Sequence, residues 1–225
     1  MAEPAARVPS GIFVLAGCNG AGKTSIAGAA LRAAGIDFFD PDHAARSIIA
    51  ANAGRAVSHH DANAHAWDIG RRLLERAIDA RQTFALETTL GGTTMTALLA
   101  HATDAGIAVH VWFVGLASLA MHVDRVRRRV AKGGHAIPVD MIRRRFVAAP
   151  ANLVKLMPGL RQLYLYDNSA EGDPDAGVRP SPRLLMQMRD QRIVQPRSLR
   201  GLLDRTPQWA KPIVAAGVKA HIARA

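Results

Sequence analysis

The sequence predicts an α/β fold in which a mostly parallel, five-stranded sheet lies between helices, giving three layers. Short apolar runs alternate with longer segments of helical periodicity along the 225 residues, and hydrophobic residues make up 49% of the chain. Alternation of this kind implies a parallel sheet with right-handed crossovers. Because ligands of such sheets bind at the carboxyl ends of the strands, polar residues that directly follow a strand are the candidates for function.

The expected elements follow from local pattern. The strands are short apolar runs rich in β-branched and aromatic residues, at residues 11–16, 36–39, 83–87, 109–114 and 163–165. The helices carry apolar residues at helical spacing, at residues 23–34, about 43–51, about 63–80, 93–105, a long segment capped by Ser118, a segment opened by Pro138, and 207–225. Together they predict one domain with a small appendage.

The division between core and appendage is expected near residue 169. Residues 1–169 contain the predicted strands and form the core, whereas residues 170–225 form a C-terminal extension that packs on it. The extension begins with a loop rich in Gly, Pro and Asp. A possible hairpin follows at residues 184–188 and 192–195, and a terminal helix ends the chain.

Charge and composition narrow the class of protein. The formal net charge is +11, which favours anionic partners such as nucleotides and phosphates and does not exclude nucleic acid. A single cysteine, Cys18, rules out a disulfide framework. No apolar run reaches about 18 residues, and the first ten residues have no apolar signal segment. The sequence therefore predicts a cytoplasmic protein without a membrane partner.

The most specific motif lies between the first predicted strand and the first predicted helix. Residues 17–24 read GCNGAGKT and match the phosphate-binding pattern G-x-x-x-x-G-K-[ST] of P-loop NTPases. Glycines let main-chain N–H groups turn toward phosphate oxygens, Lys23 reaches the β- and γ-phosphates, and the Thr24 hydroxyl ligates Mg²⁺. The expected ligand is ATP with Mg²⁺. The expected nucleotide-binding positions are Gly17, Asn19, Gly20, Ala21, Gly22, Lys23, Thr24 and Ser25.

Carboxylates follow the next two predicted strands. Asp40 and Asp42 flank Pro41; either could orient or deprotonate an acceptor hydroxyl, and the same residues could equally cap a helix. Glu87, Thr88 and Thr89 end the third strand. A carboxylate beside two hydroxyl groups suits a polar, hydroxylated substrate, and capping of the next helix is the alternative interpretation.

Two arginine-rich segments surround the Gly133-Gly134 break. Like charges at this density repel each other unless anions or carboxylates compensate them. Phosphoryl transfer needs such charge, and two helices joined at a glycine hinge resemble a lid. We expect two or three of these arginines to contact phosphate and the others to be solvated. They are Arg125, Arg128, Arg129, Arg143, Arg144 and Arg145.

Several segments, in this order, resemble the zeta toxin family of P-loop kinases, specifically its compact, chromosomally encoded branch. They are GCNGAGKTS (17–25), FFDPDHAAR (38–46), FALETTLGG (84–92), DRVRRRVAKGGHAIP (124–138), IRRRF (142–146) and YDNS (166–169). The resemblance implies an ATP-dependent phosphotransferase, with the 3′-hydroxyl of UDP-N-acetylglucosamine as the acceptor of known members. It also implies an antitoxin protein as partner.

The resemblance also implies residue roles. Asp42 takes the place of the catalytic base, and Glu87 matches a carboxylate that contacts the substrate. Lys23 and Thr24 keep the roles given above. The charge-stabilising arginines correspond to Arg129 and one of Arg144 or Arg145. The alternative function is a nucleic-acid-binding protein or polynucleotide kinase that uses the basic arginine face.

Overall fold

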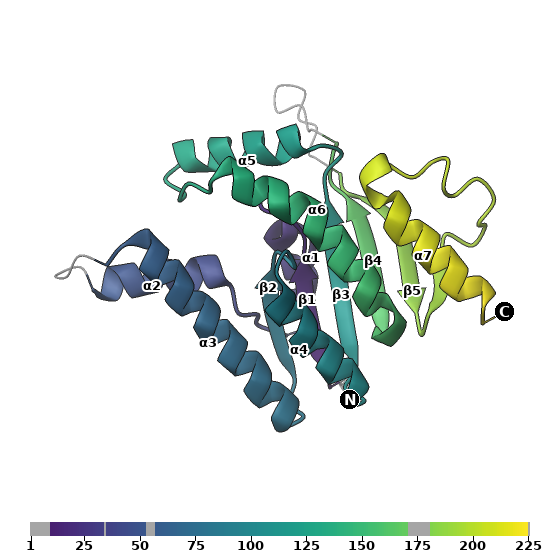
Figure 1. Ribbon diagram of the computed structural model, residues 1–225, viewed down its shortest axis with the longest axis horizontal. Coiled ribbons are helices and arrows are strands. Elements are labelled where there is room, and N and C mark those ends of the chain that lie inside the picture. Colours follow the sequence, from purple (N-terminus) through teal and green to yellow (C-terminus); the bar gives the residue numbers. More distant parts are fainter. Residues whose placement is uncertain (1–9, 34, 53–56, 171–180, 225) are drawn as a thin grey trace, which may run out of the picture.

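The computed structural model describes residues 10–33, 35–52, 57–170 and 181–224. Its centre is a six-stranded sheet in the order β2-β1-β3-β4-β5-β6 (Figure 1). The strands are β1 (Ile12–Ala16), β2 (Phe84–Thr88), β3 (Val109–Gly115), β4 (Gln162–Asp167), β5 (Arg183–Arg189) and β6 (Arg192–Gln195). The first four strands in sequence pair in parallel, and β5 and β6 are antiparallel. The α/β fold with a mostly parallel sheet is confirmed.

The number of strands differs from the prediction in two places. Residues 36–39 do not form a strand, because only Phe39 reaches the sheet, through a single parallel bridge to Leu86. Pairing stops there because the next residue caps a helix and Pro41 has no N–H to donate. The predicted hairpin, in contrast, is present as β5 and β6, and it extends the sheet beyond β4.

Helices cover the two faces of the sheet unequally. Helices α3, α4, α6 and α7 lie on one face and α1 lies on the other (Figure 1). The helices are α1 (Lys23–Ala33), α2 (Pro41–Ala51), α3 (His59–Asp79), α4 (Thr93–Asp104), α5 (Leu119–Ala131), α6 (Val139–Leu156) and α7 (Lys211–Ile222). The larger core lies under the four helices, and a smaller one, which includes Phe13 and Leu31, lies under α1. None of the helices in the described part of the chain has the length and apolar character needed to cross a membrane.

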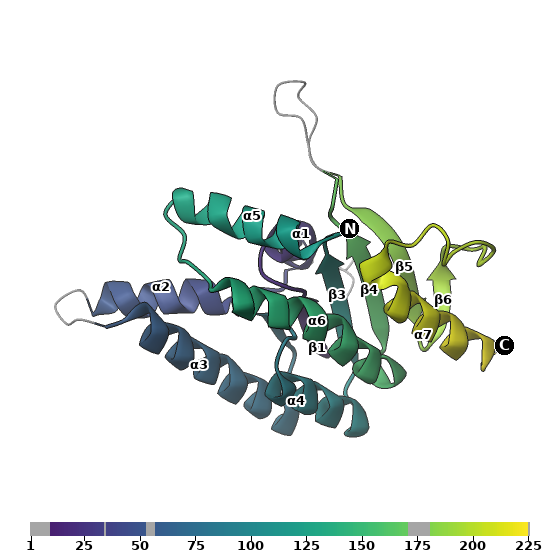
Figure 2. The same cartoon turned by 45° about the horizontal axis from the view of Figure 1, so that its top comes forward.

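Helix α5 lies across the carboxyl edge of the parallel strands (Figure 2). A small apolar cluster of Cys18, Val126 and Ile142 joins the loop after β1 to α5 and α6. The two arginine-rich helices are therefore packed against the phosphate-binding motif rather than projecting into solvent.

The C-terminal residues are continuous with the core. Helix α7 packs on α6 and β6. Trp209 lies against Gly115, where an added Cβ atom would come within 2.4 Å of the indole ring. Its Nε1–H donates to Asp167 Oδ1 at 3.3 Å. The predicted loop at residues 171–182 lies largely outside the described residues, and the domain boundary at residue 169 stays a prediction.

Candidate active site

The phosphate-binding motif forms a loop between β1 and α1, which begins at Lys23. Gly17, Gly20 and Gly22 have φ angles of 135°, 78° and 86°, which side chains with a Cβ atom rarely adopt. A Cβ atom on Gly17 would also lie 2.1 Å from the Val114 carbonyl oxygen. The strand–loop–helix context that the motif requires is therefore present, and the N-terminus of α1 points its free N–H groups into the loop.

Asn168, which directly follows β4, holds this loop through hydrogen bonds. Its Nδ2 donates to the Ala21 carbonyl oxygen at 2.9 Å, and its own carbonyl oxygen accepts from Arg125 Nη2 at 2.8 Å. The same side chain fills the space in which a Cβ atom on Gly22 would lie. Asn168 thus links the phosphate-binding loop to the end of β4, and Arg125 links Asn168 to α5.

His122, on α5, holds the loop at a second residue, Asn19. Its Nδ1 lies 2.7 Å from the Asn19 carbonyl oxygen, and because a carbonyl oxygen only accepts, Nδ1 carries the proton. Burial, as the largest cause, lowers the pKa of His122 from 6.5 to about 4. The imidazole is therefore neutral at physiological pH. Sequence reasoning missed this residue, although it occurs on the apolar stripe of a helix between Leu119 and Val126.

The depressed pKa of His122 makes stability depend on pH. In the unfolded chain the His122 side chain has a pKa of 6.5 and is protonated below that pH. In the folded protein it stays neutral down to about pH 4. Titration of His122 should therefore leave the free energy of unfolding unchanged above pH 6.5. It should decrease the free energy of unfolding between pH 6.5 and about pH 4, by up to about 3 kcal/mol in total.

Urea unfolding of His122→Asn at neutral and acidic pH tests this. Asparagine keeps an N–H donor without titrating, so we expect a smaller loss of unfolding free energy at low pH than in the unaltered protein. His101→Asn, at an exposed position on α4, is the matched control. Equal losses in all three proteins would contradict the assignment of a neutral, buried imidazole.

Glu87, near the end of β2, contacts the side chains of both Lys23 and Thr24. The Thr24 hydroxyl donates to Glu87 Oε2 at 2.6 Å, and Lys23 Nζ lies 3.3 Å from Glu87 Oε1. Lys23 is 7% exposed. The neighbouring Thr88 and Thr89 hydroxyls accept from main-chain N–H groups of the following turn, at Leu90 and Gly91. The two threonines therefore shape the turn, and Glu87 alone of this segment reaches the phosphate loop.

The structure separates the roles of Asp40 and Asp42. Asp40 is the N-cap of α2, and its Oδ1 accepts from the main-chain N–H groups of Asp42 and His43. Burial, with Glu87 next, raises the pKa of Asp40. Asp42 lies in the first turn of the helix, and its Oδ2 accepts from Arg129 Nη1 at 3.0 Å. The side chain of Asp42 is 32% exposed, so it faces solvent and α5 rather than the core.

The arginines divide into two groups. Arg129, on α5, pairs with Asp42 of α2, and Arg145, on α6, donates from Nη1 to Asn19 Oδ1 of the loop at 2.8 Å. Arg144 is exposed, and its Nε donates to the Asp140 carbonyl oxygen at 3.4 Å. Of the two candidates Arg144 and Arg145, it is Arg145 that contacts the phosphate loop. Others form helix-surface ion pairs, among them Arg128 with Asp124 and Arg143 with Asp140.

Arg129 has more donors than partners. Its Nε and Nη2 atoms are buried and have no hydrogen-bond partner among the described residues. Buried donors of this kind cost free energy unless an acceptor meets them. A group with several acceptor oxygens, such as phosphate, would satisfy them.

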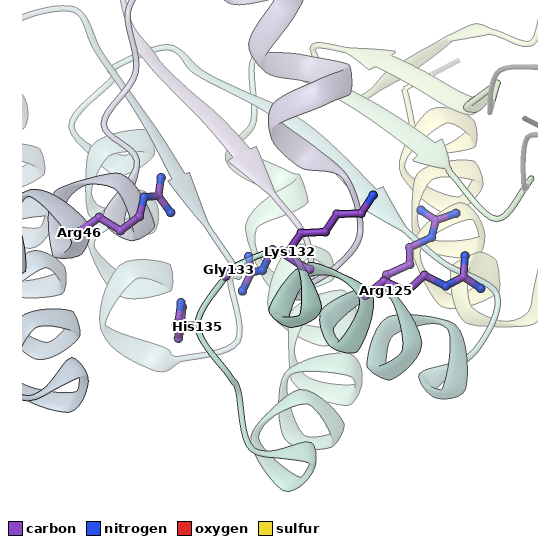
Figure 3. A pocket seen from close by; sticks show the side chains of 8 residues that line it. Arg46, Arg125, Lys132, Gly133 and His135 are labelled. Atoms are coloured by element: carbon purple, nitrogen blue, oxygen red, sulfur yellow. The ribbon is translucent and has the colours of Figure 1, made fainter.

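A pocket of about 540 Å³ lies beside Arg129. In Figure 3, Arg46 of α2 enters from one side and Arg125 of α5 from the other, with Lys132 and His135 between them. The full lining is Arg46, Arg125, Arg128, Arg129, Lys132, Gly133, Gly134 and His135. This lining contains no carboxylate among the described residues. Its arginine and lysine side chains suit the pocket to an anion. Burial, as the largest cause, lowers the pKa of His135 and so favours the uncharged imidazole.

Known proteins resemble this chain in sequence and in fold. Residues 4–166 match the zeta toxin family. The chain belongs to the zeta toxin family. An uncharacterised protein of Haemophilus influenzae is 31% identical over 130 residues, which cover 58% of this chain and 88% of that protein. As a zeta toxin family member the chain is a P-loop kinase, and the family resemblance inferred from its motifs is confirmed.

Solved structures share the fold of this zeta toxin family protein. The crystal structure of AvrRxo1-ORF1:-ORF2 with ATP matches with a TM-score of 0.65 at 17% identity, covering 97% of this chain and 77% of that one. A chain of the PezAT chromosomal toxin–antitoxin system of Streptococcus pneumoniae matches with a TM-score of 0.50 at 14% identity, covering 97% and 87%. At these identities the likeness shows the fold.

Proposed function

We propose that this kinase transfers the γ-phosphoryl group of ATP to a hydroxyl group of a small acceptor, with Asp42 as the base. The observation that carries the proposal is the place of Asp42. It pairs with Arg129, and it lies close enough to Arg145, which contacts the loop, to oppose the lowering of the Arg145 pKa by burial. The likeness of fold to the AvrRxo1-ORF1:-ORF2 structure with ATP supports ATP as the donor.

The loop side chains fit a magnesium ion. Thr24 Oγ1 and Glu87 Oε2 are oxygen ligands of the kind that Mg²⁺ prefers, and they already lie 2.6 Å apart. Bound Mg²⁺ would supply positive charge to the β- and γ-phosphate oxygens. We therefore assign Glu87 to the metal side of the site. This differs from the substrate contact that the family resemblance implies, because the Glu87 carboxylate contacts Lys23 and Thr24.

The proposed chemistry uses the chain's own groups. Asp42 accepts the proton of the acceptor hydroxyl as the new O–P bond forms and the bond from the γ-phosphorus to the β-bridging oxygen breaks. Lys23 holds the β- and γ-phosphates. Arg129 and Arg145 stabilise the charge that spreads over the transferring group. The Arg129–Asp42 pair also keeps the carboxylate oriented before the acceptor binds.

We propose UDP-N-acetylglucosamine as the first acceptor to test. The family resemblance suggests it, and the cationic pocket beside Arg129 could accept its diphosphate. The nucleic-acid alternative lacks a stacking platform at the lid, because Phe146 packs edge-on against His122 with ring centroids 5.5 Å apart. We also propose an antitoxin protein as a partner, since PezAT, which shares the fold, is a toxin–antitoxin system.

ATP consumption with different acceptors tests this function. We expect turnover to rise when UDP-N-acetylglucosamine is added and to stay at background with a single-stranded oligonucleotide. Other UDP-sugars would show how far the acceptor is selected. Stimulation by the oligonucleotide alone would favour the nucleic-acid function, and no ATP consumption with any acceptor would count against phosphotransfer.

A further inference from the structure

Arg145 reaches the phosphate loop without a carboxylate partner. It extends from α6, and its Cγ lies so close to Gly91 that a Cβ atom there would be 2.6 Å away. Within the described residues it forms no ion pair, and its polar contact is the side-chain oxygen of Asn19 at 2.8 Å. Burial is the largest cause of a lowered pKa at Arg145. Asp42 opposes this lowering from a distance, without forming an ion pair with Arg145. The guanidinium group is therefore held by an uncharged partner.

Asn19 is itself fixed at two points. The residue is 8% exposed, and its carbonyl oxygen accepts from His122 Nδ1 at 2.7 Å while its side-chain oxygen accepts from Arg145. Helix α5 thus fixes the main chain of Asn19, and α6 contacts its side chain. A change in the position of this one residue would move Arg145 relative to the loop.

We propose that Asn19 is a positioning residue for phosphoryl transfer, whose neutral amide holds Arg145 over the loop with its charge available to the γ-phosphate of ATP. An amide oxygen accepts the hydrogen bond but adds no negative charge. A carboxylate at this position would neutralise Arg145 and repel the triphosphate. The proposal rests on the proposed function, because it takes ATP as the ligand of the loop.

The test compares binding of ADP with binding of a non-hydrolysable ATP analogue by calorimetry. Arg145→Ala should weaken analogue binding by about tenfold or more and leave ADP binding nearly unchanged. Asn19→Asp is isosteric and should give the same selective loss. Asn19→Ser, which shortens the acceptor, should give a smaller one. Arg143→Ala removes the same charge from an exposed site on α6 and is the matched control.

The double variant separates positioning from damage to the loop. If Asn19 acts through Arg145, Asn19→Ser combined with Arg145→Ala should bind the analogue as Arg145→Ala alone does. Equal losses of ADP and analogue affinity in the Asn19 variants, or additive losses in the double variant, would overturn the proposal. Absence of ATP-analogue binding in the unaltered protein would instead overturn the proposed function, and this inference with it.

Discussion

Replacing Asp42 by asparagine should reduce phosphoryl transfer by about 100-fold or more while ATP binding stays nearly the same. The amide can still accept from Arg129 Nη1, whose partner is now Asp42 Oδ2. It can no longer take the proton of the acceptor hydroxyl. Transfer is measured as the rate of product formation under saturating ATP, and ATP affinity is measured separately by calorimetry.

Asp40→Asn is the discriminating control for this experiment. Asparagine caps helices about as well as aspartate, so the first turn of α2 should persist. We expect this variant to keep most of its transfer activity. If Asp40→Asn lost transfer and Asp42→Asn kept it, the N-cap and base assignments of the two carboxylates would have to be exchanged.

Lys23→Ala should weaken ATP binding by about 100-fold. The ammonium group is buried at the start of α1 and has only Glu87 as a charged partner within 4.0 Å among the described residues. Its removal takes away the donor to the β- and γ-phosphates. It also leaves the Glu87 carboxylate beside the place of the phosphates, so the variant should lose more than one attractive contact.

Binding of ATP and thermal unfolding should be measured on the same Lys23→Ala sample. A loss of affinity with a retained unfolding transition would assign the effect to the site rather than to the fold. Lys155→Ala, at an exposed position near the end of α6, removes an equal charge and should bind ATP normally. Unchanged affinity in Lys23→Ala would contradict the assignment of residues 17–24 as the nucleotide site.

The loop between β1 and α1 could be predicted from its contiguous motif. The residue types of the motif at residues 17–24 indicate phosphate binding by themselves. The apolar run before the motif indicates the strand that must precede such a loop. Asp40 and Asp42 could not be separated by pattern, because a helix cap and the proposed base are both short carboxylates beside Pro41. The distinction depends on which side chain folds back on its own helix and which meets Arg129.

The support of the loop could not be predicted, because it comes from residues far apart in the chain. Asn168 and His122 contact carbonyl oxygens of the loop across separations of 147 and 103 residues. Local pattern contains no information about such pairs, although a histidine on an apolar stripe indicates burial. The strand expected at residues 36–39 failed for a local reason instead, because the helix cap and the proline that directly follow Phe39 end its pairing with the sheet.

The central claim is that the loop and Asp42 together pass a phosphoryl group to a hydroxyl group. The fate of label from ATP marked in its γ-phosphoryl group tests this most directly, with UDP-N-acetylglucosamine as acceptor. We predict that the label appears on the sugar hydroxyl in the presence of the unaltered protein and that Asp42→Asn prevents its appearance. Label found only in inorganic phosphate or left in ATP, with that acceptor and with other small hydroxyl compounds, would contradict the account.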